Sequence, residues 1–123
     1  MKHFIPVILF VSFLFIEPGC KKAIEDAIDC GFESALLSID VQIDGTNPKL
    51  VHFEFINNDT DGRFTLDPEI KWDFGDGKTE TSSNHKIEHT YPGTGDYDVK
   101  ATYTLRRGTA SCTGPKEVQV SIN

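Results

Sequence analysis

A polar turn in the middle of the chain carries the oxygen ligands that a calcium ion would need. It reads Asn57-Asn58-Asp59-Thr60-Asp61-Gly62 and places side-chain oxygens at alternate positions ahead of a glycine. That order is the first half of a calcium-binding loop, and Asn57, Asp59 and Asp61 are the calcium candidates. Pro68 stands where such a loop would have its bidentate glutamate. Polar turns of this composition also connect ordinary strands, so a plain connecting turn is the competing interpretation.

Histidines and aspartates further along the chain are the other candidates for chemistry. His85 and His89 are four residues apart; on a strand they would be about 13 Å apart, too far to share one metal ion. Asp73 and Asp76 could form a carboxylate pair. However, Asp76 precedes Gly77, a residue pair preferred in a two-residue hairpin turn, and Asp73 alternates outward along its strand. We therefore predict no catalytic residues, no histidine metal site and no cofactor other than the calcium alternative.

The elements that position these residues are strands, because from residue 35 onward apolar residues recur at every second position. The runs cover 35–43, 51–55, 70–74, 78–81, 87–91, 97–105 and 118–122. About seven strands at short spacing, with no helix after residue 30, predict an all-β, immunoglobulin-like sandwich of two antiparallel sheets. Tyr97 stands two residues before the inward position Val99, which is the local signature of a tyrosine corner, and Trp72 is expected in the core.

The beginning of the chain is typical of an export signal. Lys2 precedes an almost entirely apolar run over 4–16, and Gly19 stands directly before Cys20. The run is shorter than the roughly 20 residues of a membrane-spanning helix. It resembles the bacterial lipoprotein signal, which implies a signal peptide over 1–19, a lipidated Cys20 with a tether over 20–34, and a sandwich domain over 35–123. An ordinary cleaved signal and an uncleaved anchor are the alternatives.

Charge and cysteine content restrict the partners and the compartment. The formal net charge of −7 argues against nucleic acid, because phosphate binding needs a basic face. With Cys20 lipidated, Cys30 and Cys112 remain, and in an oxidising compartment we expect them to form a disulfide. That bond would contribute up to ~4–5 kcal/mol in the chain-entropy model. A metal pair is the alternative, although the chain has no Cys-x-x-Cys spacing.

Three motifs resemble the PKD (polycystic kidney disease) domain family when they are read in order. They are Trp72-Asp73-Phe74-Gly75-Asp76-Gly77, His89-Thr90-Tyr91 and Gly95-Asp96-Tyr97-Asp98-Val99. The resemblance covers roughly residues 35–123 and implies an immunoglobulin-like sandwich that is displayed outside the cell and makes protein or carbohydrate contacts. It also implies a structural role for the motif residues Trp72, Asp73, Phe74, Gly75, Asp76, Gly77, His89, Tyr91, Gly95 and Tyr97.

These observations together predict a membrane-anchored, extracytoplasmic binding module that is not an enzyme. Its partners would be the membrane, through the lipid, and an envelope protein or glycan. Lys21 after Cys20 favours the outer membrane, because retention at the inner membrane usually requires aspartate there. The alternatives are a structural or assembly subunit of an envelope complex, acting as a spacer, and a small hydrolase.

Overall fold

The structure, a computed structural model, describes residues 33–123. The signal segment, Cys20, Cys30 and the predicted tether up to residue 32 therefore lie outside the described residues. Within that range no helix has the length and apolar character needed to cross a membrane. The elements are the 3₁₀ turn η1 (Ser34–Leu36) and the strands β1 (Leu37–Ile43), β2 (Leu50–Asn57), β3 (Thr65–Leu66), β4 (Ile70–Asp73), β5 (Thr79–Ser82), β6 (Lys86–Thr90), β7 (Gly95–Arg107) and β8 (Ala110–Ile122).

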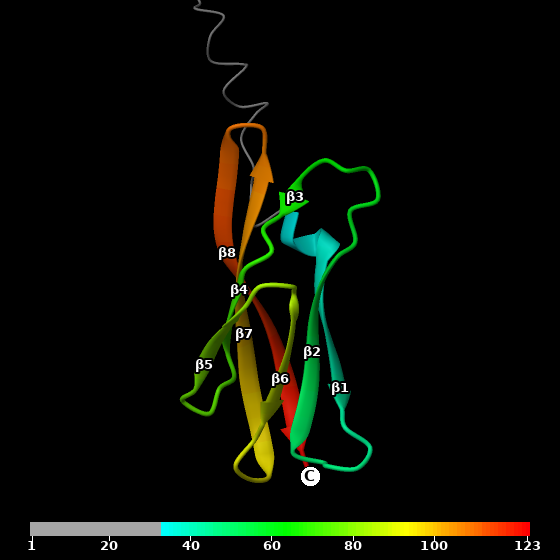
Figure 1. Cartoon of the computed structure of the whole chain (residues 1–123), viewed down its shortest axis with the longest axis vertical. Helices are drawn as coiled ribbons and strands as arrows, with labels where there is room; N and C mark the ends of the chain where they lie inside the picture. Colours follow the sequence, from blue (N-terminus) through cyan, green and yellow to red (C-terminus); the bar gives the residue numbers. More distant parts are fainter. Residues whose placement is uncertain (1–32) are drawn as a thin grey trace, which may run out of the picture.

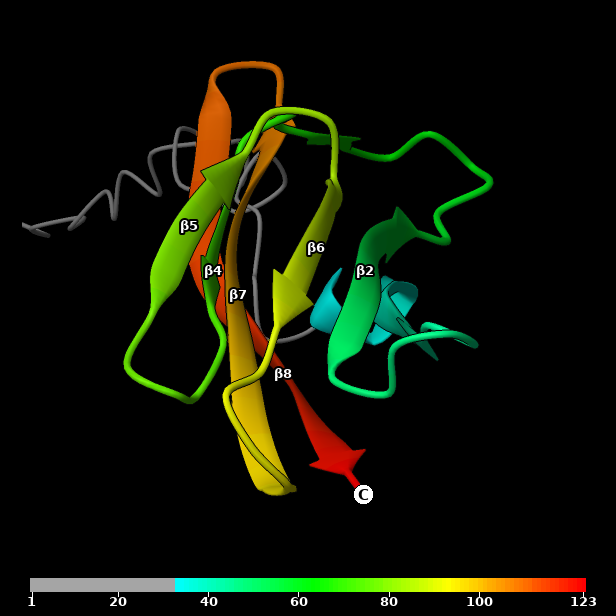
Figure 2. The same cartoon turned by 60° about the horizontal axis from the view of Figure 1, so that its bottom comes forward.

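The strands form two antiparallel sheets, which confirms the predicted sandwich (Figure 1). One sheet has the order β1-β2-β6. In the other, β7 pairs with β8 along one side and with β3 and β4 along the other, and β5 pairs with β4. The turned view of Figure 2 shows β2 and β6 on one side of the molecule and β4, β5, β7 and β8 on the other. The far end of the β7–β8 hairpin extends beyond the rest of the sandwich (Figure 1).

Aromatic side chains from both sheets fill the space between them. Trp72 on β4 is fully buried, and its ring centroid lies 5.6 Å from that of Phe53 and 6.4 Å from that of Phe55, both on β2. Its indole N–H donates to the hydroxyl of Ser82 at 2.9 Å. Phe55 also contacts Tyr103 of β7, with centroids 5.4 Å apart. Because each aromatic side chain buries about 150–250 Å² of surface, this cluster holds the two sheets together, and the predicted core Trp72 is confirmed.

The predicted tyrosine corner is also confirmed. The hydroxyl of Tyr97 donates to the backbone carbonyl of Gly93 at 3.0 Å, and Val99 two residues later is fully buried. The bond ties the start of β7 to the turn that precedes it. The ring of Tyr97 lies on that of Tyr91, with centroids 4.2 Å apart.

The strand boundaries differ from the prediction by one or two residues at several ends, and three differences have a clear physical reason. β1 begins at Leu37 because η1 occupies the preceding residues. β3 is a two-residue strand that was not predicted, because no apolar alternation covers it. It forms because Thr65 and Leu66 pair with β7. β8 begins at Ala110 instead of residue 118; its first half follows β7 residue by residue although Gly114 and Pro115 interrupt the apolar alternation.

The prediction of a two-residue turn at Asp76 and Gly77 is wrong. β4 ends at Asp73, β5 begins at Thr79, and residues 74–78 form the connection. The reason is that Asp76 turns inward to contact His89, as described below. The same loop approaches β7 closely at Gly75, where φ is +80° and an added Cβ would lie 2.5 Å from the carbonyl oxygen of Asp98.

Candidate functional site

The motif aspartate and histidine lie together inside the sandwich. Oδ2 of Asp76 is 2.7 Å from Nε2 of His89, and the two side chains are only 2% and 9% exposed. The His89 ring stacks on Phe74, with centroids 3.9 Å apart and an interplanar angle of 3°. The hydroxyl of Tyr91 donates to the backbone carbonyl of Phe74 at 3.0 Å. The cluster therefore ties the β4–β5 loop to β6, a structural role that the family resemblance implies for these residues.

The carboxyl of Asp76 remains ionised in this buried position. Burial alone would raise its pKa, but the hydrogen bonds from His89 and from the backbone N–H of Lys78 outweigh burial and hold the pKa below its usual value. Asp73 has a separate partner, since its Oδ1 accepts the backbone N–H of Gly75 at 3.1 Å. The two aspartates thus serve different contacts.

Of the calcium candidates, Asn57 ends β2, and Asp59 and Asp61 lie in the β2–β3 connection. The side-chain oxygens of Asn57 and Asp59 accept hydrogen bonds from the loop backbone. Oδ1 of Asn57 accepts the N–H of Asp59 at 2.9 Å, and Oδ1 of Asp59 accepts that of Asp61 at 3.2 Å. Oδ2 of Asp59 accepts the N–H of Arg63 at 2.7 Å and that of Phe64 at 3.3 Å. Burial would raise the pKa of Asp59, but these backbone bonds lower it.

No group of three or more His, Cys, Asp or Glu side chains within residues 33–123 is arranged to hold a metal ion. Calcium at Asn57, Asp59 and Asp61 stays a prediction. His85 and His89 also have separate partners: Nε2 of His85 lies 2.9 Å from the carbonyl oxygen of Asp67, whereas His89 contacts Asp76.

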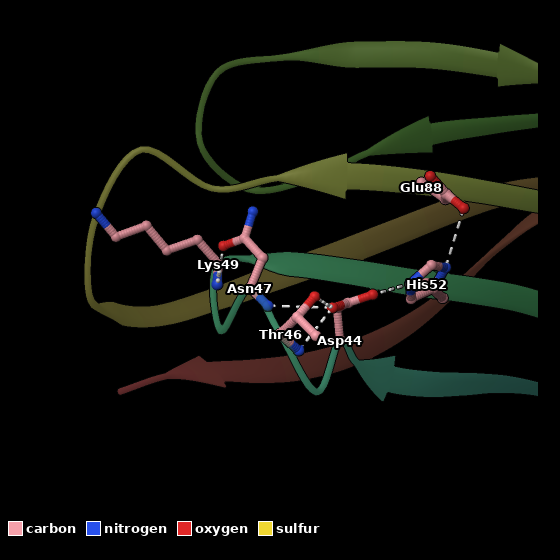
Figure 3. A network of polar contacts seen from close by, with 6 residues as sticks. All are labelled: Asp44, Thr46, Asn47, Lys49, His52 and Glu88. Atoms are coloured by element: carbon pink, nitrogen blue, oxygen red, sulfur yellow. Dashed lines mark hydrogen bonds and ion pairs between the residues drawn. The ribbon is translucent and has the colours of Figure 1, made fainter.

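A second polar cluster, centred on His52, lies on the outer face of the β1-β2-β6 sheet (Figure 3). Nε2 of His52 is 3.2 Å from Oδ2 of Asp44, and Nδ1 is 3.1 Å from Oε1 of Glu88. The strand register places His52 of β2 between Gln42 of β1 and Glu88 of β6. Both ring nitrogens can donate to these carboxylates only when the imidazole carries two protons.

Asp44 is held firmly by the turn between β1 and β2 (Figure 3). Its Oδ1 accepts the hydroxyl of Thr46 at 2.7 Å, the N–H of Thr46 at 2.8 Å and the N–H of Asn47 at 3.0 Å. These bonds, the Thr46 hydroxyl first, hold the pKa of Asp44 well below its usual range, and the contact with His52 acts in the same direction. The turn thus supplies a permanent negative charge beside His52.

The same face carries a groove of about 500 Å³. Six of its lining residues form two rows across the three strands: Asp40, Glu54 and Lys86 in one, and Gln42, His52 and Glu88 in the next. Their side chains are open to solvent, with Lys86 65% and Glu88 64% exposed.

The sequence did not predict this cluster. It indicated only that His52 lies on the outer face, because His52 alternates with the apolar residues of its strand. The residues around it are brought together by strand pairing, which the sequence does not specify.

Comparison with known proteins agrees with the three motifs. The family profile described as PKD domain matches residues 39–120, which include every motif residue named above. Collagenase ColA of Clostridium perfringens is 36% identical over 75 residues, covering 61% of this chain and 6% of the collagenase. The chain therefore spans only a small part of the length of that relative.

Two solved structures are also similar. The PKD1 domain of Vibrio anguillarum Epp has 25% identity and a TM-score of 0.47, covering 71% of this chain and 93% of that one. The PKD1 domain of the Vibrio cholerae metalloprotease PrtV has 26% identity and a TM-score of 0.46, covering 69% and 94%. The profile match spans well over half of the chain, and the chain therefore belongs to the PKD domain family of non-catalytic modules found in extracellular proteins.

Proposed function

We propose that this protein is a lipid-anchored binding module of the cell envelope, and that its PKD domain contacts an envelope protein through the outer face of the β1-β2-β6 sheet. The groove on that face is the observation that carries the proposal. Binding sites are concave and present a few well-placed polar groups, and this groove combines both features. Lys86 and Glu88 are more than half exposed, so a partner can reach them directly.

The side chains available at the surface favour a protein over a glycan. Within residues 33–123 every Phe, Tyr and Trp side chain is buried or half-buried. An exposed aromatic ring that could stack against a sugar is therefore lacking in this part of the chain. The groove offers charged and amide groups instead, which suit the charged side chains and backbone of a polypeptide.

The anchor in this proposal rests on the sequence before residue 33. The apolar run and Cys20 support lipidation, and Lys21 supports the outer membrane. A stable anchor requires more than one acyl chain, and a bacterial lipoprotein would carry two or three. The Cys30–Cys112 disulfide also stays a prediction, because Cys30 lies outside the described residues.

The anchor is tested by the intact mass of the protein extracted from its native host. We expect a chain that starts at Cys20, carries acyl mass and stays with the membrane fraction. A Cys20→Ala variant should lose both the acyl mass and the membrane association. An unlipidated wild-type product would contradict the anchor and make a secreted binder the better description.

Binding is tested by placing a photo-reactive residue at Gln42 in living cells, with Gln119 as the matched control. Both glutamines are exposed strand residues; Gln42 lies in the groove, whereas Gln119 lies on β8 of the other sheet. We expect one defined protein to cross-link from Gln42 and not from Gln119. No cross-link, or the same products from both positions, would overturn the groove as the binding face. If Gln42 and Gln119 cross-link equally to a protein that co-purifies with this chain in a fixed stoichiometry, the structural spacer role is favoured.

A further inference from the structure

We infer that the groove on the β1-β2-β6 face binds an extended polypeptide segment that carries lysine or arginine at alternate positions. This inference rests on the proposed function and specifies the chemistry of the partner. It starts from the charges on the groove face. The groove is lined by three acidic side chains, Asp40, Glu54 and Glu88, and Asp44 lies beside it. The basic side chains that line it are Lys86 and His52.

The cations present do not neutralise this face. Nζ of Lys86 is 4.0 Å from Oε1 of Glu54, a long contact between two well-exposed side chains. The carboxylate of Asp40 accepts a hydrogen bond from the amide of Gln42 at 3.3 Å, and it is exposed. Among the side chains that line the groove, three carboxylates face one lysine, so the groove is negative whether or not His52 carries a charge. A cationic partner is therefore electrostatically complementary to it.

The carboxylates stand in two neighbouring rows of the sheet. Asp40 on β1 and Glu88 on β6 lie one row apart along the strands, about 6.5 Å, and two strands apart across the sheet, about 9.6 Å. Alternate side chains of an extended peptide start about 6.5 Å apart, which matches the row spacing. The long side chains of lysine and arginine cover the separation across the strands, so basic residues at positions i and i+2 can each reach a carboxylate of one row.

Other occupants of the groove fit less well. Anionic lipid headgroups and nucleic acid are repelled by its charge, and a second copy of this chain carries the same net charge of −7. Within residues 33–123 no three acidic, histidine or cysteine side chains are arranged to hold a metal ion. The ammonium of lysine and the guanidinium of arginine need no such arrangement, because each pairs with a single carboxylate.

The test measures the binding of synthetic peptides to the mature chain purified in a neutral detergent. The probe is a Lys-Thr alternating octapeptide, and a Glu-Thr octapeptide is the control peptide. We expect the lysine peptide alone to bind and to shift backbone NMR signals of β1, β2 and β6. Asp40→Asn with Glu88→Gln should weaken binding about tenfold. The matched variant Glu80→Gln with Glu117→Gln, on exposed positions of β5 and β8, should weaken it less than about twofold.

Absence of lysine-peptide binding, or equal weakening in both carboxylate pairs, would overturn the inference. If the peptide fails while Gln42 still cross-links to one protein, the proposed function stands with a partner of different chemistry. If both experiments fail, the groove is not a binding face.

Discussion

Replacing Asp76 by alanine should cost this domain a large share of its stability. The substitution removes the 2.7 Å contact with Nε2 of His89 and leaves that side chain, 9% exposed, without its partner. Losing a buried hydrogen bond to a charged group costs about 1.5–3 kcal/mol. We take the upper end, about 3 kcal/mol, because the variant also loses the bond that Asp76 accepts from the backbone N–H of Lys78. For a domain of 60–100 residues that loss corresponds to a fall in Tm of roughly 12–24 °C.

The assay is urea unfolding of the wild type and the variant, with Asp73→Ala as the matched control. Asp73 lies at the end of β4 just before the same loop, is half-buried, and accepts one backbone N–H from Gly75. Its loss should cost about 1 kcal/mol or less. The double variant Asp76→Ala with His89→Phe keeps an aromatic ring on Phe74 and should lose less than the sum of the two single changes.

The pH dependence of the same variant tests the cause. Since the pKa of Asp76 is lower in the folded chain than its usual value, its stabilisation is fully present above about pH 4 and is lost as the pH falls through the folded-state pKa. The difference in unfolding free energy between the wild type and Asp76→Ala should therefore narrow in acid. A loss smaller than about 1 kcal/mol at pH 7, or a difference that is constant down to pH 2, would refute this account.

Three further predictions concern the residues around this cluster. Gly75→Ala should destabilise the domain by at least about 2 kcal/mol in urea unfolding, because its φ is +80° and the new Cβ would lie 2.5 Å from the carbonyl oxygen of Asp98; a neutral result would show that the loop can move away. Tyr97→Phe should cost about 1 kcal/mol in the same assay, since one hydrogen bond of the tyrosine corner is lost while the ring remains. Burial raises the pKa of Tyr91 and Tyr103, so both phenols should ionise above pH 10 in an absorbance titration of the folded chain. The free energy of unfolding should fall as the pH rises past about 10. In urea, which unfolds the chain, both phenols should ionise at the ordinary tyrosine pKa.

The sequence predicts most of the fold because the core is built from local alternation. The inward residues of β2, β4 and β7 recur at every second position, and all are buried except Tyr97, which is half-buried. Trp72 and Tyr97 are recognisable from their neighbours in the chain. Where alternation is absent, as around Gly114 and Pro115 in β8, the strand is held by pairing with β7 along its whole length, and local sequence carries no sign of it.

The polar sites were harder to predict because they depend on contacts between distant segments. The Asp-Gly pair at Asp76 and Gly77 normally indicates a tight turn, but the contact with His89, thirteen residues away, draws the aspartate inward and lengthens the loop. Asp44, His52 and Glu88 meet only because β2 pairs with β1 on one side and β6 on the other. A shift of either pairing by one residue would separate them. That register is set by the buried alternation and the turns of whole strands, so the residues next to His52 do not reveal it by themselves.

The chain uses the same pairing of histidine with carboxylates twice, and solvent exposure separates the two uses. Around His89 the single carboxylate of Asp76 lies 2.7 Å away, both side chains are buried, and an aromatic ring covers the imidazole. A partner molecule cannot reach that pair without unfolding the loop, so it serves stability. Around His52 there are two carboxylates at 3.1 and 3.2 Å, and the 64% exposed Glu88 can exchange its contact with the histidine for one with a ligand. Exposed ion pairs contribute little to stability, so such an exchange costs the fold little. The outer cluster is therefore the one whose substitution should change binding while leaving unfolding nearly unaltered.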